Sequence, residues 1–158
     1  AHLVLFGAPC LSPQAYATEA SALLAQCREA GAQLLLHGDP ERLAMSAADG
    51  LHLPSRLLAS FESRPVPKNM WLAASVHDAT ELEHAQRLGV DFVVLSPVAA
   101  TASHPDVTPM GWSAFSALVQ KAAIPVYALG GMGDKDVPLA LEAGGQGVAG
   151  IRGVFVGI

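Results

Sequence analysis

The chain has 158 residues, of which 51% are apolar and 15% are charged, and its formal net charge is −5. This balance predicts one folded domain with a buried core over residues 1–158 and excludes a disordered chain. The nine Lys and Arg residues are scattered and the apolar runs reach only about six residues, so we expect no nucleic-acid partner and no membrane span.

Short apolar runs alternate with helix-like segments along the chain. The runs predict strands at residues 3–6, 33–37, 50–53, 71–75, 92–95, 126–129 and 147–151. The segments between them predict helices at residues 13–30, 40–47, 78–88, 111–122 and 134–143. Several helix starts carry a capping residue or an N1 proline, namely Ser12-Pro13, Asp39-Pro40, Asp78 and Asp134. Residues 55–69 show no regular pattern.

Several helices end at a small residue that is followed directly by a continuous apolar run. Residues 29–37, 88–96 and 143–151 show this repeat most clearly. Gly suits a helix end because it adopts a left-handed backbone without a Cβ clash. A continuous apolar run is typical of a parallel strand that is covered on both faces. The repeat therefore predicts an α/β fold with a parallel sheet.

Two architectures fit this alternation, a (β/α)8 TIM barrel and an open doubly wound sheet. No G-x-G-x-x-G motif follows the first strand, which favours the barrel. A closed barrel of this type has eight strands, and seven are recognised in this chain. We therefore expect an incomplete barrel in which the first βα unit and the last helix are missing.

Two glycine-rich strand ends near the C-terminus predict a phosphate site. Backbone without side chains lets an anion approach N–H groups closely, and the loops after the last two strands are a common phosphate site in such barrels. The alternative is a pair of tight turns. The predicted phosphate-binding residues are Gly130, Gly131, Gly150, Ile151 and Arg152, although Arg152 could equally be a solvated side chain.

Polar side chains at the other strand ends are candidates for substrate contacts and catalysis. His37, Ser75 and His77 are expected to face a ligand. The loop of residues 96–110 is long enough to be a lid, and the alternative is a solvated, proline-stiffened loop. Its polar residues Thr101, Ser103 and His104 are the catalytic candidates.

The remaining histidines and the two cysteines do not indicate a metal site. His52 alternates with leucines, which predicts a packed barrel histidine, and His84 is expected at the surface of a helix. None of the histidines has the spacing of a ligand set. Cys10 and Cys27 form neither a disulfide framework nor a metal-like cluster, which favours a cytoplasmic protein.

Several segments, in this order, resemble the thiamine phosphate synthase/TenI family. Residues 49–53 (DGLHL) resemble its "DGVHL" strand, and residues 74–82 (ASVHDATEL) resemble its "S-x-H-x-x-x-E" strand and helix start. Residues 96–101 (SPVAAT) resemble "GPVFPT", and residues 125–132 (PVYALGGM) resemble "PVVAIGGI". Two further patterns resemble barrels that are fused behind a Nudix hydrolase domain. They are LSP…TASHP…GW (residues 95–97, 101–105 and 111–112) and YALGG…AGIRG (residues 127–131 and 149–153).

The resemblance implies a role in thiamine biosynthesis or salvage and a phosphorylated thiazole or thiamine-like ligand. Family synthases join a pyrimidine pyrophosphate to a thiazole phosphate and hold the departing pyrophosphate with Mg²⁺. The family's Asn-Asp pair corresponds to His37-Gly38, and its second acidic ligand falls near Arg56-Leu57. Mg²⁺ is therefore expected only if synthase activity is retained. The family's phosphate glycines correspond to Gly130 and Gly131.

Three functions remain open at this point. The first is an enzyme, either a synthase or a TenI-type tautomerase in which His104 replaces the family's catalytic histidine. The second is a non-catalytic regulatory or structural domain of a Nudix hydrolase fusion, with a homodimer as a further possible assembly. The third is another phosphate-binding barrel, an epimerase or aldolase. The positions of Lys68, Lys121 and Lys135 in loops or at helix ends disfavour the aldolase.

Overall fold

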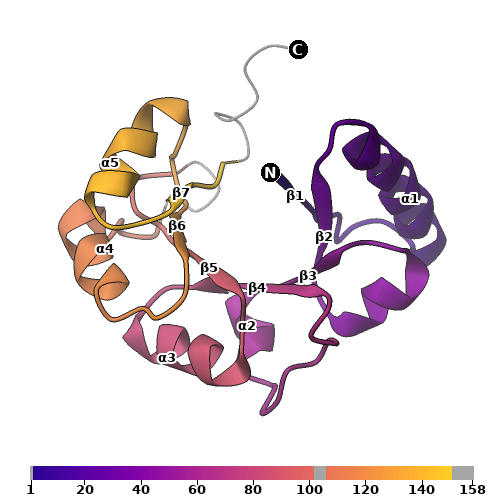
Figure 1. Cartoon of the computed structure of the whole chain (residues 1–158), viewed down its shortest axis with the longest axis horizontal. Helices are drawn as coiled ribbons and strands as arrows, with labels where there is room; N and C mark the ends of the chain where they lie inside the picture. The colour runs from indigo at the N-terminus through magenta and orange to yellow at the C-terminus, as the bar shows by residue number, and fades with distance from the viewer. Residues whose placement is uncertain (1, 102–105, 151–158) are drawn as a thin grey trace.

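Seven parallel strands form one sheet in the computed structural model, which describes residues 2–101 and 106–150. The strands follow one another in chain order: β1 (Leu3–Phe6), β2 (Gln33–His37), β3 (Gly50–Leu53), β4 (Trp71–Val76), β5 (Phe92–Leu95), β6 (Val126–Ala128) and β7 (Gly147–Val148). Figure 1 shows the sheet curling through a C-shaped arc, with β1 and β7 at its two ends and the helices on its outside. The chain is an α/β protein with a TIM-like, curled half-barrel, as its sequence predicts.

The helices are α1 (Pro13–Glu29), α2 (Ser55–Leu58), α3 (Ala79–Leu88), α4 (Gly111–Val119) and α5 (Val137–Glu142), with 3₁₀ segments η1 (Pro40–Met45) and η2 (Asp134–Asp136). Three predicted caps are confirmed, because Ser12 accepts the Ala15 N–H, Asp39 accepts the Glu41 N–H and Asp78 accepts the Glu81 N–H. The predicted cap at Asp134 is wrong, since Gly133 holds that position and Asp134 is the first residue of η2. None of the helices in the described ranges has both the length and the apolar character needed to cross a membrane.

The structure corrects three details of the predicted elements. The predicted helix at 40–47 is the shorter 3₁₀ segment η1. The predicted helix at 134–143 divides into η2 and α5, because Pro138 lacks an N–H and lies in the first turn of a new helix. The irregular stretch 55–69 begins with the one-turn helix α2.

Two layers of side chains lie on opposite faces of the curled sheet. On the outer face, Leu34 and Leu36 of β2 are fully buried against α1, where Tyr16, Ala20 and Leu24 meet them. The outer faces of β3 to β6 pack in the same way on α2 to α5. Successive strand side chains point to opposite faces, so the alternate residues point into the lumen of the arc.

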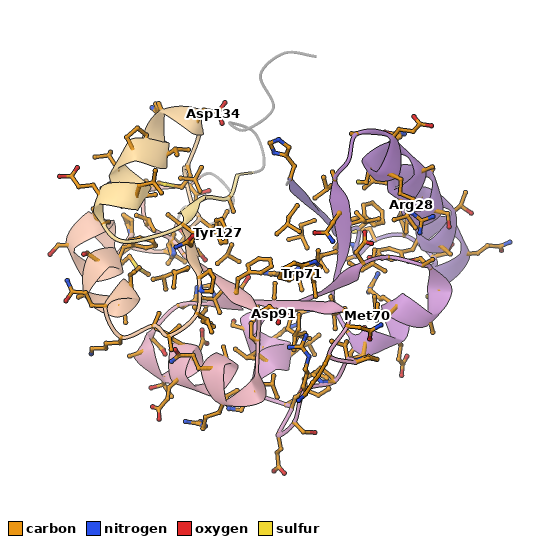
Figure 2. The ribbon with its side chains drawn as sticks, in the orientation of Figure 1. Arg28, Met70, Trp71, Asp91, Tyr127 and Asp134 are labelled. Atoms are coloured by element: carbon orange, nitrogen blue, oxygen red, sulfur yellow. The ribbon has the colours of Figure 1, made fainter. Side chains whose placement is uncertain are left out.

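An aromatic row lines the lumen. The Trp71 ring lies 6.1 Å from the Phe92 ring, and Phe92 lies 5.6 Å from Tyr127, both edge-to-face. The Trp71 Nε1–H donates to Gln33 Oε1 across 3.1 Å. Figure 2 shows Trp71 and Tyr127 pointing into the hollow of the arc. Trp71 keeps 38% of its surface exposed, so it is a lumen side chain that packs on one side only.

His84 does not lie free on the helix surface as expected. Its ring is half-buried, and Nε2 lies 3.0 Å from each of the carbonyl oxygens of Leu58 and Phe61. A carbonyl only accepts, so Nε2 carries the proton. His84 therefore anchors the segment after α2 to α3.

Two aspartates fasten the starts of neighbouring strands. The Asp49 N–H donates to the Leu34 carbonyl (2.8 Å), and Asp49 Oδ2 accepts the Leu34 N–H (2.8 Å). Asp91 repeats this arrangement on Leu72, with distances of 2.8 and 2.7 Å. Each carboxylate thus replaces a strand carbonyl where the ladder begins, which fixes the register of β2 with β3 and of β4 with β5.

Arg64 connects the irregular stretch 59–70 to the second of these aspartates. Its Nη2 lies 2.8 Å from Asp91 Oδ2 and 2.7 Å from the Met70 carbonyl, and its Nη1 donates to the Gly89 carbonyl. The Arg64 side chain is only 15% exposed. This partly buried pair therefore joins one long connection to two strand starts.

We expect Asp91→Ala to lower the free energy of unfolding by about 2–4 kcal/mol, because it leaves the Leu72 N–H without its acceptor and the partly buried Arg64 guanidinium without its counter-charge. Urea unfolding followed by circular dichroism measures this change. The matched control is Glu83→Ala, which removes the exposed pair of Glu83 with Arg87 (3.0 Å) and should cost at most about 0.5 kcal/mol. Equal losses for the two variants would contradict the role assigned to Asp91.

Candidate functional site

The register of β2, β3 and β4 brings three polar side chains to the lumen near the carboxyl ends of the strands. His37 pairs with His52, and His52 pairs with Ala73. Ser75 lies two residues after Ala73 and points to the same face. The predicted substrate residues His37 and Ser75 therefore meet around a third residue, His52.

These three side chains form one hydrogen-bonded chain. His37 Nδ1 lies 2.9 Å from His52 Nδ1, and His52 Nε2 lies 3.3 Å from Ser75 Oγ. The two imidazoles are stacked with their centroids 5.1 Å apart. His52 is 3% exposed, whereas His37 and Ser75 are half-buried. The packed position predicted for His52 is confirmed, and its hydrogen bonds were not foreseen.

Burial keeps this chain neutral. Burial, together with a smaller effect of the neighbouring His37, lowers the pKa of His52 to about 3. Burial also lowers the pKa of His37, and the positive charges of Arg56 and Arg42 act in the same direction. A neutral imidazole carries one N–H, so only one of the two facing Nδ1 atoms holds a proton.

Arg42 of η1 lies beside this cluster. Its Cζ stands 4.3 Å over the Tyr16 ring, and its Nε lies 3.9 Å from Asp39 Oδ2. The Gly38 backbone lies against the same guanidinium, since a Cβ at Gly38 would be 2.7 Å from Arg42 Nε. Asp39 itself caps η1, because its Oδ1 accepts the Glu41 N–H. The carboxylate is thus engaged by backbone and is not directed at the lumen cluster.

His77 connects the ends of β4 and β5. Its Nδ1 lies 2.7 Å from the Ser96 carbonyl oxygen, so Nδ1 carries the proton and donates it. Its backbone N–H donates to Glu81 Oε2 across 2.7 Å. The residue itself is exposed, which leaves it accessible to a ligand at the strand ends.

Gly130 and Gly131 pack tightly against the segment that follows β5. Their φ angles are +99° and +67°, a backbone region that residues with a Cβ rarely adopt. A Cβ on Gly130 would lie 2.9 Å from Pro97 Cα, and one on Gly131 would lie 2.4 Å from the Ala100 carbonyl oxygen. Glycine is therefore required at both positions by conformation and by space.

The remaining predicted site residues fall into two groups. Thr101 lies in the segment after β5, Gly150 lies in the segment after β7, and both are half-buried. Ser103, His104, Ile151 and Arg152 lie outside the described residues. Within the described part of the chain, His, Cys, Asp and Glu do not gather in groups of three or more that could hold a metal ion.

Comparisons with known proteins agree on one family. A family model described as "TMP-TENI: Thiamine monophosphate synthase" matches residues 1–154. A protein named "Putative thiamine-phosphate synthase 2" from Aquifex aeolicus is 34% identical over 119 residues, which are 75% of this chain and 64% of the relative. A thiamine-phosphate synthase from Synechococcus sp. (strain WH7803) is 33% identical over 138 residues, 87% of this chain and 39% of the relative. The chain thus spans less than two thirds of the length of these relatives.

Solved structures support the same fold. The thiamine phosphate pyrophosphorylase from Pyrococcus furiosus superposes with a TM-score of 0.79 at 20% identity, covering 94% of this chain and 71% of that chain. FabK from Thermotoga maritima superposes less closely, with a TM-score of 0.68 at 12% identity over 94% of this chain and 49% of that chain. At these identities the likeness concerns the fold alone, and the family follows from the sequence match. The chain belongs to the thiamine monophosphate synthase (TMP-TENI) family.

Proposed function

We propose that this chain is a divergent thiamine phosphate synthase/TenI-like domain that binds a phosphorylated thiazole or thiamine-like ligand at the carboxyl ends of its strands. The observation that carries the proposal is the pair of side-chain-free residues Gly130 and Gly131 directly after β6, of which Gly131 is exposed. Backbone held this way has no side chains to keep an anion from its N–H groups. Gly150, Ile151 and Arg152 complete the proposed phosphate site.

In this proposal, the part of the site that binds pyrophosphate in family synthases is built from different residues in this chain. Where family synthases hold Mg²⁺, this chain has His37-Gly38 and Arg56, and Asp39 is engaged as a helix cap. Mg²⁺ prefers oxygen ligands such as carboxylates, so these residues do not fit the ion. We therefore propose that pyrophosphate chemistry is lost here and route no step through Mg²⁺.

Any remaining catalysis is then acid–base chemistry on the bound ligand. His104, with Thr101 and Ser103, is the proposed catalytic group, because an imidazole titrates near neutral pH. Turnover that is unchanged in His104→Ala would remove this assignment.

The second candidate function is a non-catalytic regulatory or structural domain of a Nudix hydrolase fusion. The same replacement of carboxylates by His37 and Arg56 favours it, since binding needs no metal. Ligand binding without any turnover supports this reading, whereas isomerisation of a thiazole phosphate supports the enzyme. We further propose a single cytoplasmic domain over residues 1–158, with a homodimer as its assembly.

Calorimetry should detect binding of a thiazole phosphate with the same affinity in Mg²⁺ and in a chelator, because the proposed phosphate contacts are made by protein groups. With both synthase substrates and Mg²⁺ present, we expect no pyrophosphate release. Mg²⁺-dependent release of pyrophosphate would show that the synthase reaction is retained.

Gly131→Ala should weaken binding of the thiazole phosphate by roughly tenfold or more, because the new methyl group meets the Ala100 carbonyl and displaces the strand end. The matched control is Gly31→Ala. Gly31 has the same kind of backbone (φ +66°) but no atom within 4 Å of an added Cβ. The control should lose about 1 kcal/mol of stability and keep its affinity. The assignment of this strand end fails if both variants bind equally well.

A further inference from the structure

The hydrogen-bonded chain of His37, His52 and Ser75 has two possible proton arrangements. In the first, Ser75 donates to His52 Nε2 and His52 Nδ1–H donates to His37 Nδ1. In the second, His37 Nδ1–H donates to His52 Nδ1 and His52 Nε2–H donates to Ser75 Oγ. Both arrangements satisfy the contacts of 2.9 and 3.3 Å, because each imidazole nitrogen serves as donor in one tautomer and as acceptor in the other.

Protonation of His37 permits only the second arrangement. A charged imidazole has a proton on both nitrogens, so His37 Nδ1 must donate and His52 Nδ1 must accept. The His52 proton then lies on Nε2, and Ser75 Oγ accepts it. The hydroxyl proton of Ser75 is released from the chain at the same moment.

This second arrangement presents two donors of the kind that an anion needs. They are the Nε2–H of charged His37 and the hydroxyl of Ser75, which come from strands on either side of β3. Charge-assisted donors of this type bind oxyanions well. We propose that His37, His52 and Ser75 form a proton relay, through which binding of an oxyanion at the ends of β2 to β4 takes up one proton from solvent.

The proton balance is simple. One proton enters from solvent, either directly at His37 Nε2 or at Ser75 Oγ with a concerted shift along His52. In both cases the net charge of the relay rises by one, and no covalent bond to the ligand forms or breaks. His52 acts as a positioning residue, since its ring passes the proton between the other two members.

The charged surroundings decide the direction of the coupling. The groups that act on His37 are Arg56 of α2, Arg42 of η1 and the neutral His52 of β3, while Gly7 after β1 contacts its ring without charge. Burial and, to a smaller extent, the two arginines lower the pKa of His37 in the free protein. An anion beside them offsets their field and raises that pKa, so binding and proton uptake reinforce each other.

Sulfate is the appropriate probe, because it keeps its charge across the range in which a phosphate monoester titrates, near pH 6. Calorimetry at pH 6 to 8 in two buffers of different ionisation enthalpy counts the protons taken up. We expect uptake of up to one proton. Affinity should fall by up to roughly tenfold per pH unit as pH rises from the free to the bound pKa of His37. Uptake of no proton, or the absence of sulfate binding, would overturn the proposal.

Ser75→Ala tests the end of the relay opposite His37 and leaves the buried His52 side chain in place. It leaves the His52 Nε2–H of the second arrangement without an acceptor, so the pKa of His37 should fall by about one pH unit in the free protein. Nitrogen-15 NMR of the imidazoles reports both this pKa and the tautomer of His52. Proton uptake on sulfate binding should decrease in this variant. An unchanged His37 titration would show that Ser75 is not connected to it.

His84→Gln serves as the control, since His84 is on α3 in the helix layer outside the sheet, and its ring nitrogens lie near the Leu58 and Phe61 carbonyls and Arg87 Nη2. It should leave sulfate affinity and proton uptake as in the unmodified chain. The inference rests on the proposed function only for the anionic nature of the natural ligand. If thiazole phosphate does not bind, the sulfate and NMR experiments therefore still test the proton relay by themselves.

Discussion

The register of the parallel strands is the constraint on which the rest of this molecule depends, and two carboxylates hold it. Asp49 and Asp91 each occupy the place of a strand residue, with the backbone N–H donating and the side chain accepting on the same neighbour. A parallel strand displaced by one residue would point every side chain to the opposite face. The histidine on the displaced strand, His37 or His52, would then face a helix instead of the other histidine. The site near the carboxyl ends of the strands is therefore set by contacts at their amino ends.

The two halves of the proposed site offer different kinds of groups to an anion. Near β6 the available group is the backbone of Gly130 and Gly131, of which Gly131 is exposed, and this backbone carries no formal charge. Near β2 to β4 the available groups are a half-buried imidazole, a hydroxyl and the field of Arg42 and Arg56. A chain with a net charge of −5 thus places positive potential at one end of its strand edge.

Most of the architecture could be predicted because it is encoded locally. Continuous apolar runs and helix-ending glycines predict the seven strands, six of them to the residue or to within one residue at each end. The η1 and η2 segments were predicted as α-helix because periodicity alone does not separate a 3₁₀ turn from an α turn. The pairing of His37 with His52 was missed, since it depends on strand register and not on spacing along the chain. Their shared position near the ends of adjacent predicted strands was the available signal.

The lumen of the arc has a thermodynamic consequence. Leu3, Leu5 and Trp71 already expose 39%, 50% and 38% of their surfaces in the folded chain. The heat capacity increment and the denaturant dependence of unfolding both grow with the apolar surface that unfolding newly exposes. Each of these residues adds less to either quantity than a fully buried residue of its size would, and most of the fully buried apolar side chains lie between the strands and the helices. The curvature of the stability curve with temperature is therefore a property of the outer wall of the barrel.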